Sequence, residues 1–184
     1  MSVAKLMSRI VACDDFLDNS VAPESGNLAS FKHRQTFGIA SDPLTLFACA
    51  FSALIHDAEH PGVPNAQLAK EGTDLAKQYN NRSVAEQNSV HIAWDLLMMD
   101  RFTALREAIC PNDTVMARFR QLVVNGVMAT DIMDPDLKAL RNQRWDTAFS
   151  DEDKDESLAK TRNRKATIVI EHLIQASDVA HTMQ

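Results

Sequence analysis

Two histidines, an aspartate and a glutamate lie within the five residues from His56 to His60, in the stretch HDAEHPGVPN. An apolar run over residues 44–55 precedes the stretch, and a Pro-Gly pair, which ends helices, interrupts it. Imidazole and carboxylate donors with no cysteine nearby are typical of a hydrolytic divalent-metal site. The stretch predicts metal ligands at the end of a buried helix, with the adjacent His56 and Asp57 as the strongest candidates.

Four carboxylates continue apolar stripes at helical spacing, and such stripes face the core of a protein. Each carboxylate has apolar neighbours one or two turns away: Asp57 follows Ala53 and Leu54, Glu86 precedes Val90, Ala93, Trp94 and Leu97, Asp131 follows Val123, Val124, Val127 and Met128, and Asp178 follows Ile170 and Ile174. A buried carboxylate without a partner is strongly unfavourable, so these groups are expected to be paired, protonated or bound to metal. Histidines accompany two of them, since His56 and His60 flank Asp57 and His181 follows Asp178 by one turn.

Most of these residues also have a purely structural interpretation, which taken singly is the simpler one for all but His56 and Asp57. Glu86 could complete a capping box with Ser83, Asp131 could lie at a frayed helix end, Thr130 could bond back to its own helix, Asp178 could be a surface residue and Asn65 could be an N-cap. Four carboxylates on inward stripes together favour a common site.

The composition of the chain limits the classes of protein to which it can belong. The chain has 184 residues, 45% of them hydrophobic and 24% charged, which suits one soluble domain. No stretch alternates like a two-faced strand, none is long enough to span a membrane, and no signal peptide is evident. A net charge of −6 disfavours a nucleic-acid-coating surface. Three widely spaced cysteines argue against a disulfide framework or a zinc ribbon and favour a reducing, cytoplasmic location.

Helical periodicity predicts an all-α fold. Helix starts with capping residues and proline occur at Ser41-Asp42-Pro43 and at Pro111-Asn112-Asp113, and a possible capping box occurs at Ser83-x-x-Glu86. We predict helices over residues 1–12, 43–56, 83–99, 111–130, 135–145 and 158–180, and loops over residues 18–30 and 150–157.

The motifs resemble those of class I cyclic nucleotide phosphodiesterases. HDAEHPGVPN resembles the HD-x-x-HPG-x-x-N signature of that family, and LAKQYNNRSVAEQNSV resembles its segment ending Y-N-x-x-S-V-L-E-N-H-H. VMATDIM resembles its L-A-T-D-M, and IQASDVAHTMQ resembles its H-x-A-D-x-x-H/N-P segment. The four motifs occur in the family's order between His56 and His181.

The resemblance implies an all-α helical bundle of the HD phosphohydrolase type, built around two divalent metal ions, zinc and magnesium or manganese. It implies that cyclic AMP or cyclic GMP is hydrolysed to the 5′-monophosphate by a metal-bridging hydroxide. It also implies roles for individual residues: His56, Asp57 and Asp178 as metal ligands, His60, Glu86 and Thr130 as groups that hold waters around the second metal, and Asp131 as a group behind them.

Departures from the family pattern predict that residues 1–184 are part of a catalytic domain, truncated at both ends. The family's H-N-x-x-H-A signature, which supplies a further metal histidine and the general acid, occurs nowhere in the sequence. The general-acid histidine is therefore expected upstream of Met1, which would make Met1 an internal methionine or a mis-assigned start. The base-binding pocket is expected beyond the last motif.

Two further departures lie inside the motifs. The family's H-H after Glu86 is here Asn88-Ser89, and its final proline is Thr182. We expect the chain alone to be inactive or nearly so toward cyclic nucleotides and to contain no catalytic acid. We also expect it to associate through apolar faces that missing parts of its domain would cover.

Two alternatives remain at the level of sequence. One is another HD-type phosphohydrolase, which the ordered Y-N, A-T-D and S-D segments disfavour. The other is a catalytically inactive helical module that binds nucleotide or a partner, which the absent histidines favour for this chain. Neither the preference between cyclic AMP and cyclic GMP nor the status of Met1 as a true start follows from these residues.

Overall fold

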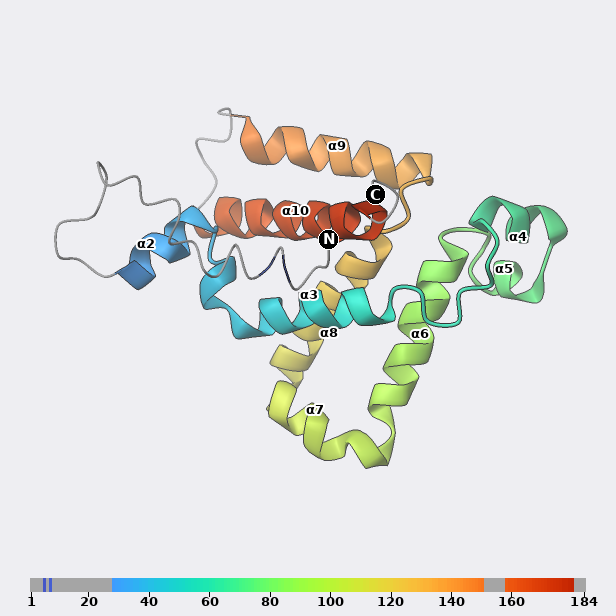
Figure 1. Cartoon of the computed structure of the whole chain (residues 1–184), viewed down its shortest axis with the longest axis horizontal. Coiled ribbons are helices and arrows are strands. Elements are labelled where there is room, and N and C mark those ends of the chain that lie inside the picture. Colours follow the sequence, from blue (N-terminus) through green and yellow to red (C-terminus); the bar gives the residue numbers. More distant parts are fainter. Residues whose placement is uncertain (1–4, 6, 8–27, 151–157, 181–184) are drawn as a thin grey trace.

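The computed structural model describes residues 5, 7, 28–150 and 158–180 of the chain. All regular structure in this part of the chain is helical, which confirms the all-α prediction (Figure 1). The elements are α2 (Leu28–Gln35), η1 (Ile39–Ser41), α3 (Pro43–Ile55), α4 (Asn65–Glu71), α5 (Asp74–Gln78), α6 (Val84–Met98), η2 (Asp100–Phe102), α7 (Thr103–Ile109), α8 (Asp113–Met128), α9 (Pro135–Phe149) and α10 (Leu158–Val179). None of the described helices is long and apolar enough to cross a membrane.

Helix α8 is the centre of the main core, because it packs on both α3 and α6. Phe119, Val123 and Val127 repeat at helical spacing along α8 and are almost completely buried. They meet Ala48 and Ile55 from α3, and Ala93 and Leu97 from α6. This packing fixes the directions of the three helices that carry or precede all the candidate site residues except His60 and Asp178.

A glycine allows α3 and α8 to approach closely. A Cβ atom placed on Gly126 would lie 2.7 Å from the Oγ atom of Ser52 and 2.9 Å from its Cβ atom. Ser52 is fully buried, and its hydroxyl donates to the carbonyl of Val123 over 3.4 Å. The contact is one turn before His56 and little more than one turn before Asp131, so it sets the spacing between the C-terminal ends of α3 and α8.

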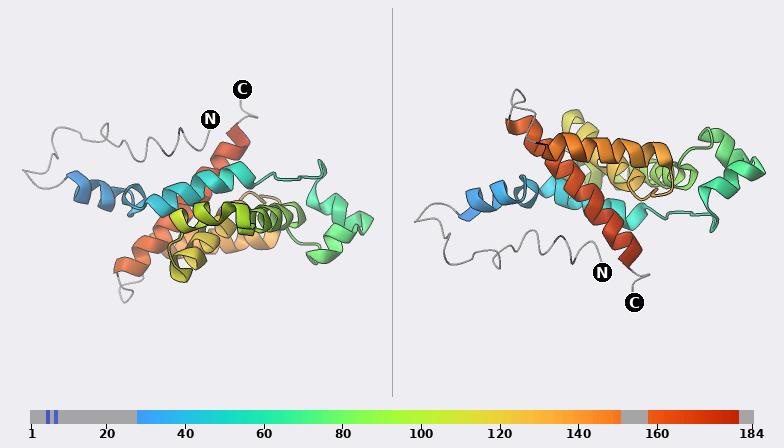
Figure 2. Two further views of the ribbon diagram at one scale, coloured as in Figure 1. Left: turned by 90° about the horizontal axis from the view of Figure 1, so that it is seen from below. Right: turned by 90° about the horizontal axis from the view of Figure 1, so that it is seen from above.

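Helices α9 and α10 form the other side of the molecule. Helix α10 crosses α3, as the two views of Figure 2 show, and buries Ile170 and Ile174 against Ile39 and Cys49. An ion pair of 2.6 Å between Arg144 of α9 and the buried Glu171 of α10 joins these two helices. The crossing brings the C-terminal end of α10 beside that of α3.

The predicted long helices are confirmed, with bounds that differ by a few residues. Helix α9 continues to Phe149, four residues beyond the predicted end, and α2 begins at Leu28, inside a predicted loop. Helices α4, α5 and α7 were not predicted.

Some predictions concern residues that the structure does not describe. The predicted helix over residues 1–12, apart from the helical Lys5 and Met7, lies outside the described residues, as does the predicted loop over residues 151–157. Met1 also lies outside them, so the expectation of a general-acid histidine upstream of Met1 stays a prediction.

Candidate metal centre

His56, Asp57 and Asp178 meet at the C-terminal ends of α3 and α10. The Nε2 atom of His56 lies 3.3 Å from Oδ2 of Asp57 and 3.2 Å from Oδ1 of Asp178. One ligand atom from each residue lies within 4.8 Å of the other two, and within the described part of the chain no other three His, Cys, Asp or Glu side chains gather in this way. The fold thus brings together the three residues that the sequence predicts as metal ligands.

The backbone orients the imidazole of His56. Its Nδ1 atom lies 3.0 Å from the carbonyl oxygen of Ala53, which can only accept, so Nδ1 carries a proton and donates it. The Nε2 atom then directs a lone pair, or a second proton, toward two carboxylate oxygens. A lone pair facing two anionic oxygens is unfavourable unless a cation lies between them, and a donated Nδ1–H is the usual support for a metal-binding imidazole.

The spacing of these atoms fits a divalent ion. Zinc binds imidazole nitrogen and carboxylate oxygen at about 2.0–2.2 Å, which places neighbouring ligand atoms about 3–3.5 Å apart. The separations of 3.2 and 3.3 Å around His56 Nε2 fall in that range. The side chain of Asp57 is 67% exposed, so one of its oxygens faces solvent beside the cluster.

A second group of polar side chains lies around Asn65. Its Nδ2 atom donates to Oε2 of Glu86 over 2.8 Å and to Oδ2 of Asp131 over 3.3 Å. Its Oδ1 atom accepts from the backbone N–H of Ala85 over 2.9 Å. The interpretation of Asn65 as an N-cap is therefore wrong, because Pro64 occupies that position and Asn65 bridges two carboxylates.

Burial raises the pKa of Glu86, and the negative charge of Asp131 acts in the same direction. The hydrogen bond from Asn65 and the charge of His60 act in the opposite direction, but the pKa of Glu86 stays above its ordinary value. The capping-box interpretation of Glu86 is wrong, since Ser83 makes no side-chain cap. Glu86 therefore holds a proton, or attracts a cation, more readily than an exposed glutamate.

Thr130 and Asp131 follow the end of α8, and the side chain of each already makes hydrogen bonds to the backbone. Asp131 is buried, and its Oδ1 atom accepts from the backbone N–H groups of Met133 and Asp134. The hydroxyl of Thr130 donates to the carbonyl of Val127 over 2.7 Å, which confirms the back-bonding alternative for this residue. His60 is exposed, and its Nδ1 atom accepts from the N–H of Gly62.

The predicted apolar stripes are buried for three of the four carboxylates. Ala93 and Leu97, Val123 and Val127, and Ile170 and Ile174 are buried, as expected for Glu86, Asp131 and Asp178. The stripe before Asp57 is partly wrong, because Leu54 is 80% exposed on the side of α3 that faces neither α8 nor α10. His181 lies outside the described residues.

Sequence reasoning did not identify the role of Ser89. Its side chain is fully buried on α6, and its hydroxyl donates to the carbonyl of Ala58 over 2.9 Å. This hydrogen bond holds the loop that follows His56 and Asp57 against α6. It supplies a polar bridge at the position where the resemblance led us to expect an imidazole, and the only signal in the sequence was that departure.

The chain is similar to known proteins, over most of its length to a family model and over about half of its length to curated relatives. A family model described as 3′5′-cyclic nucleotide phosphodiesterase matches residues 27–184. The dual specificity calcium/calmodulin-dependent 3′,5′-cyclic nucleotide phosphodiesterase 1C of Mus musculus is 39% identical over 89 residues, which cover 48% of this chain and 12% of that protein. A probable 3′,5′-cyclic-AMP phosphodiesterase of Caenorhabditis elegans is 33% identical over 89 residues, or 48% of this chain and 13% of that protein.

A solved structure shares the fold. The crystal structure of the phosphodiesterase domain of the RhoPDE fusion protein from the choanoflagellate Salpingoeca rosetta aligns with a TM-score of 0.58 and 21% sequence identity, over 78% of this chain and 45% of that chain. The aligned part of this chain thus corresponds to less than half of that structure, and the curated relatives are several times longer than the region they match.

Proposed function

The chain belongs to the 3′5′-cyclic nucleotide phosphodiesterase family, and from that premise we propose that its metal centre serves the hydrolysis of a 3′,5′-cyclic nucleotide to the 5′-monophosphate. The observation that carries the proposal is the convergence of His56, Asp57 and Asp178 at a spacing that fits a divalent ion. The named relatives act on 3′,5′-cyclic nucleotides, and we assign that substrate class, without a choice between cyclic AMP and cyclic GMP, to this site.

The proposed role of the three ligands is to hold one ion and to present an oxygen to a second. His56 is oriented by Ala53, and Asp178 approaches from α10. The exposed carboxylate of Asp57 would bind one ion through each of its two oxygens. When bound, the two divalent ions, zinc and magnesium or manganese, would supply a nucleophile near neutral pH and positive charge against the phosphoryl oxygens.

The second polar group would hold waters around the second ion. We assign this role to His60, Glu86 and Thr130, with Asp131 behind them. Glu86 and Asp131 are held together by Asn65, which keeps two carboxylates close in a partly buried place. Thr130 donates its proton to Val127 and keeps its oxygen lone pairs as acceptors for a water.

Protonation of the leaving 3′-oxygen has no assigned residue in this chain. The sequence contains no H-N-x-x-H segment, and our proposal places the histidine that would donate this proton upstream of Met1. We therefore expect the chain alone to leave cyclic AMP and cyclic GMP uncleaved even when metal is bound. A metal-binding and nucleotide-binding module without catalysis is the contrary outcome that the test must distinguish from this proposal.

The test uses a substrate whose leaving group needs no proton. Zinc and manganese binding would be measured by calorimetry for the chain, for Asp178→Asn and for the control Asp95→Asn, an exposed aspartate on α6. Hydrolysis of bis(p-nitrophenyl) phosphate would then be followed with each metal. We expect metal binding and metal-dependent cleavage by the chain and by the control, and loss of both in Asp178→Asn.

Two other results would redirect the assignment. A chain that binds metal through Asp178 but cleaves neither the activated ester nor cyclic nucleotides would support the non-catalytic module. A chain that binds no metal, or a control variant that loses metal as fully as Asp178→Asn, would remove the basis of the proposal.

A further inference from the structure

A polar cavity of about 350 Å³ lies at the opposite end of α3 from His56. Its walls come from α2, η1, the N-terminal end of α3, α8 and the N-terminal half of α10. Helix α3 has 13 residues, so about 20 Å of helix separates the cavity from the metal centre. A ligand in this cavity could not contact His56 or Asp57, and the cavity is a separate site.

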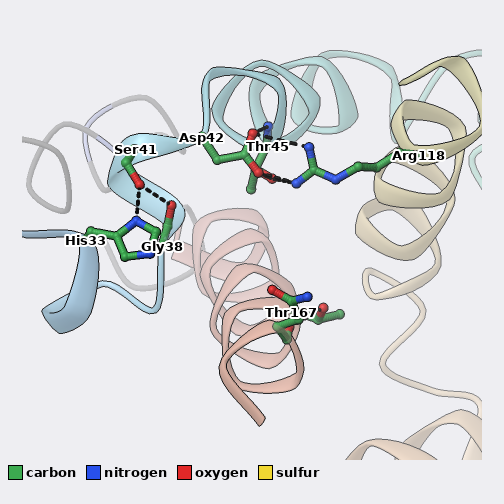
Figure 3. A network of polar contacts seen from close by, with 8 residues as sticks. His33, Gly38, Ser41, Asp42, Thr45, Arg118 and Thr167 are labelled. Atoms are coloured by element: carbon green, nitrogen blue, oxygen red, sulfur yellow. Dashed lines mark hydrogen bonds and ion pairs between the residues drawn. The ribbon is translucent and has the colours of Figure 1, made fainter. Parts of the chain in front are cut away.

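One wall of the cavity is a charged cluster at the start of α3. Arg118 reaches from α8 to the carboxylate of Asp42, which also accepts from the hydroxyl and the backbone N–H of Thr45 (Figure 3). Burial acts to raise the pKa of Asp42, but the hydrogen bonds from Arg118 and Thr45 outweigh it, and the pKa lies below its ordinary value. The carboxylate is therefore ionised and neutralises Arg118.

The guanidinium of Arg118 has N–H donors that its contacts with Asp42 and Thr45 do not use. Two of its contacts go to Asp42 and one goes to the hydroxyl of Thr45. A guanidinium has five N–H donors, so about two remain for another acceptor.

The opposite wall carries a cation that has no partner among the described residues. Arg162 on α10 is half-buried beside the cavity, and it makes no hydrogen bond or ion pair with any residue that the structure describes. Asn163 and Thr167 line the same wall, and the hydroxyl of Thr167 donates to the backbone carbonyl of Asn163. A partly buried charge without a counter-charge costs free energy, and none of the residues that the structure describes supplies one to Arg162, so this wall favours an anion.

The charge balance of the cavity is opposite in sign to that of the chain. Two guanidiniums face one carboxylate, whereas the whole chain carries a net charge of −6. Ser41 and Thr45 add hydroxyl oxygens, and His33 contacts the hydroxyl of Ser41. Arginine pairs well with phosphate because its planar fork matches two phosphate oxygens at once.

The size of the cavity restricts the ligand further. A volume of about 350 Å³ lies at the lower end of the range of small-molecule pockets and suits a ligand no larger than a mononucleotide. We propose that this cavity binds a small organic phosphomonoester, with the phosphate between Arg162 and the free donors of Arg118. The proposal does not depend on the function assigned to the metal centre.

The experiment is a calorimetric titration of the whole chain in the presence of a chelator. Adenosine 5′-monophosphate is the probe, and adenosine, which lacks the phosphate, is its matched control. We expect one molecule of the monophosphate to bind per chain and adenosine not to bind. Arg162→Gln should lower the affinity for the monophosphate about tenfold or more, because it removes a charge-assisted hydrogen bond. Arg101→Gln, which removes an exposed arginine from η2, should leave the affinity unchanged.

Two further variants keep the test informative if Arg162→Gln folds poorly. Arg162→Lys keeps the charge and loses the fork, so its affinity should lie between those of the parent and Arg162→Gln. Asp42→Asn keeps a capping side chain but removes the negative charge, so it should bind the monophosphate several-fold more tightly than the parent. A misfolded variant would not give that gain.

Asp178→Asn separates this site from the metal centre, and it should bind the monophosphate like the parent. The proposal is overturned if the monophosphate does not bind at millimolar concentration, if adenosine binds equally well, or if Arg101→Gln weakens binding as much as Arg162→Gln. Loss of binding in Asp178→Asn would place the phosphate at the metal centre and would also overturn it.

Discussion

His56 and Asn65 each use one end of the side chain to fix the position of the other. His56 donates Nδ1–H to the carbonyl of Ala53 and turns Nε2 toward Asp57 and Asp178. Asn65 accepts from the N–H of Ala85 and turns its amide nitrogen toward Glu86 and Asp131. Pairs of carboxylates are thus kept near one another by side chains that are themselves held by the backbone.

Removal of the amide of Asn65 should destabilise the fold. Asn65→Ala removes one hydrogen bond each from Glu86, Asp131 and the N–H of Ala85. Asp131 keeps its hydrogen bonds from Met133 and Asp134. We expect the free energy of unfolding to fall by about 1–3 kcal/mol. The measurement is urea unfolding in the presence of a chelator. Asn142→Ala, an exposed asparagine on α9, should change the free energy by less than about 0.5 kcal/mol. Equal effects of the two substitutions would contradict the bridging role.

The raised pKa of Glu86 predicts a pH dependence of stability. The cause is first burial and then the charge of Asp131. A carboxyl group whose pKa is higher in the folded state binds its proton more tightly there, so its ionisation lowers stability as the pH rises from about its ordinary pKa through the folded pKa. Glu86→Gln should therefore be more stable than the parent at about pH 7, and the difference should shrink as the pH is lowered toward about pH 4.

Urea unfolding of both proteins across this pH range, with chelator present, checks this prediction. Glu107→Gln, which changes an exposed glutamate on α7, is the matched control and should follow the parent at every pH. A stability difference between Glu86→Gln and the parent that grows on acidification would show that the sign is wrong.

At the scale of single residues, the sequence predicted the members of the site better than their contacts. Residue type and spacing were enough to single out the adjacent His56 and Asp57, whereas Asp178, on a buried stripe, was predicted as a ligand through the family resemblance. The contacts of Asn65 were not predictable from local pattern, because its partners are 21 and 66 residues away and only the crossing of α6 and α8 brings them together.

Among the elements, the crossing of α3 and α8 is the most restrictive contact. Gly126→Ala would normally favour a helix by about 1 kcal/mol, but here the new methyl group would overlap Ser52. We expect Gly126→Ala to lower the free energy of unfolding by about 1–3 kcal/mol. Thermal and urea unfolding would measure it.

A double-mutant cycle tests the cause of that effect. Ser52→Gly removes two of the three atoms that the methyl group would meet and leaves Cδ1 of Ile174, at 3.0 Å. The pair Ser52→Gly and Gly126→Ala should therefore be more stable than the sum of the single effects by about 0.5 kcal/mol or more. Ser52→Ala leaves the Cβ atom in place and should rescue less. Stabilisation by Gly126→Ala alone would show that the helices can separate at no cost.

Helix length explains which elements could be predicted. Helices α3, α6, α8 and α10 have 13 to 22 residues and buried faces that repeat over several turns. Helices α4, α5 and α7 have seven, five and seven residues, which is too short for a repeating apolar face to stand out. Their formation depends on packing at their sites, which the local sequence does not encode.

For the whole molecule, metal binding should raise the free energy of unfolding and the Tm. An ion that binds only the folded chain adds about 2.7 kcal/mol at a concentration of one hundred times its Kd. For a chain of this size we expect the Tm to rise by about 5–11 °C. Scanning calorimetry with zinc or manganese, and again after addition of a chelator, measures this rise. Asp178→Asn should show no rise, and an equal rise in that variant would place the ion elsewhere.

Large apolar side chains remain on the surface of the molecule. Met133 is 83% exposed and Leu158 is 90% exposed. Such side chains are the structural counterpart of the apolar faces expected from the sequence, and self-association of the chain stays a prediction.

Because the ribosome makes the chain from the N-terminus, the residues of the proposed metal centre are synthesised at different times. His56 and Asp178 are 122 residues apart, so at ordinary rates of synthesis the histidine is made on the order of 6–24 s before its partner. During that interval the face of α3 that carries Cys49 and Ala53 lacks α10, the helix that contributes Ile170 and Ile174 to the same cluster. In the proposed metal centre, His56 and Asp57 would therefore be made first as two ligands, and tight binding of an ion would wait for Asp178 on α10.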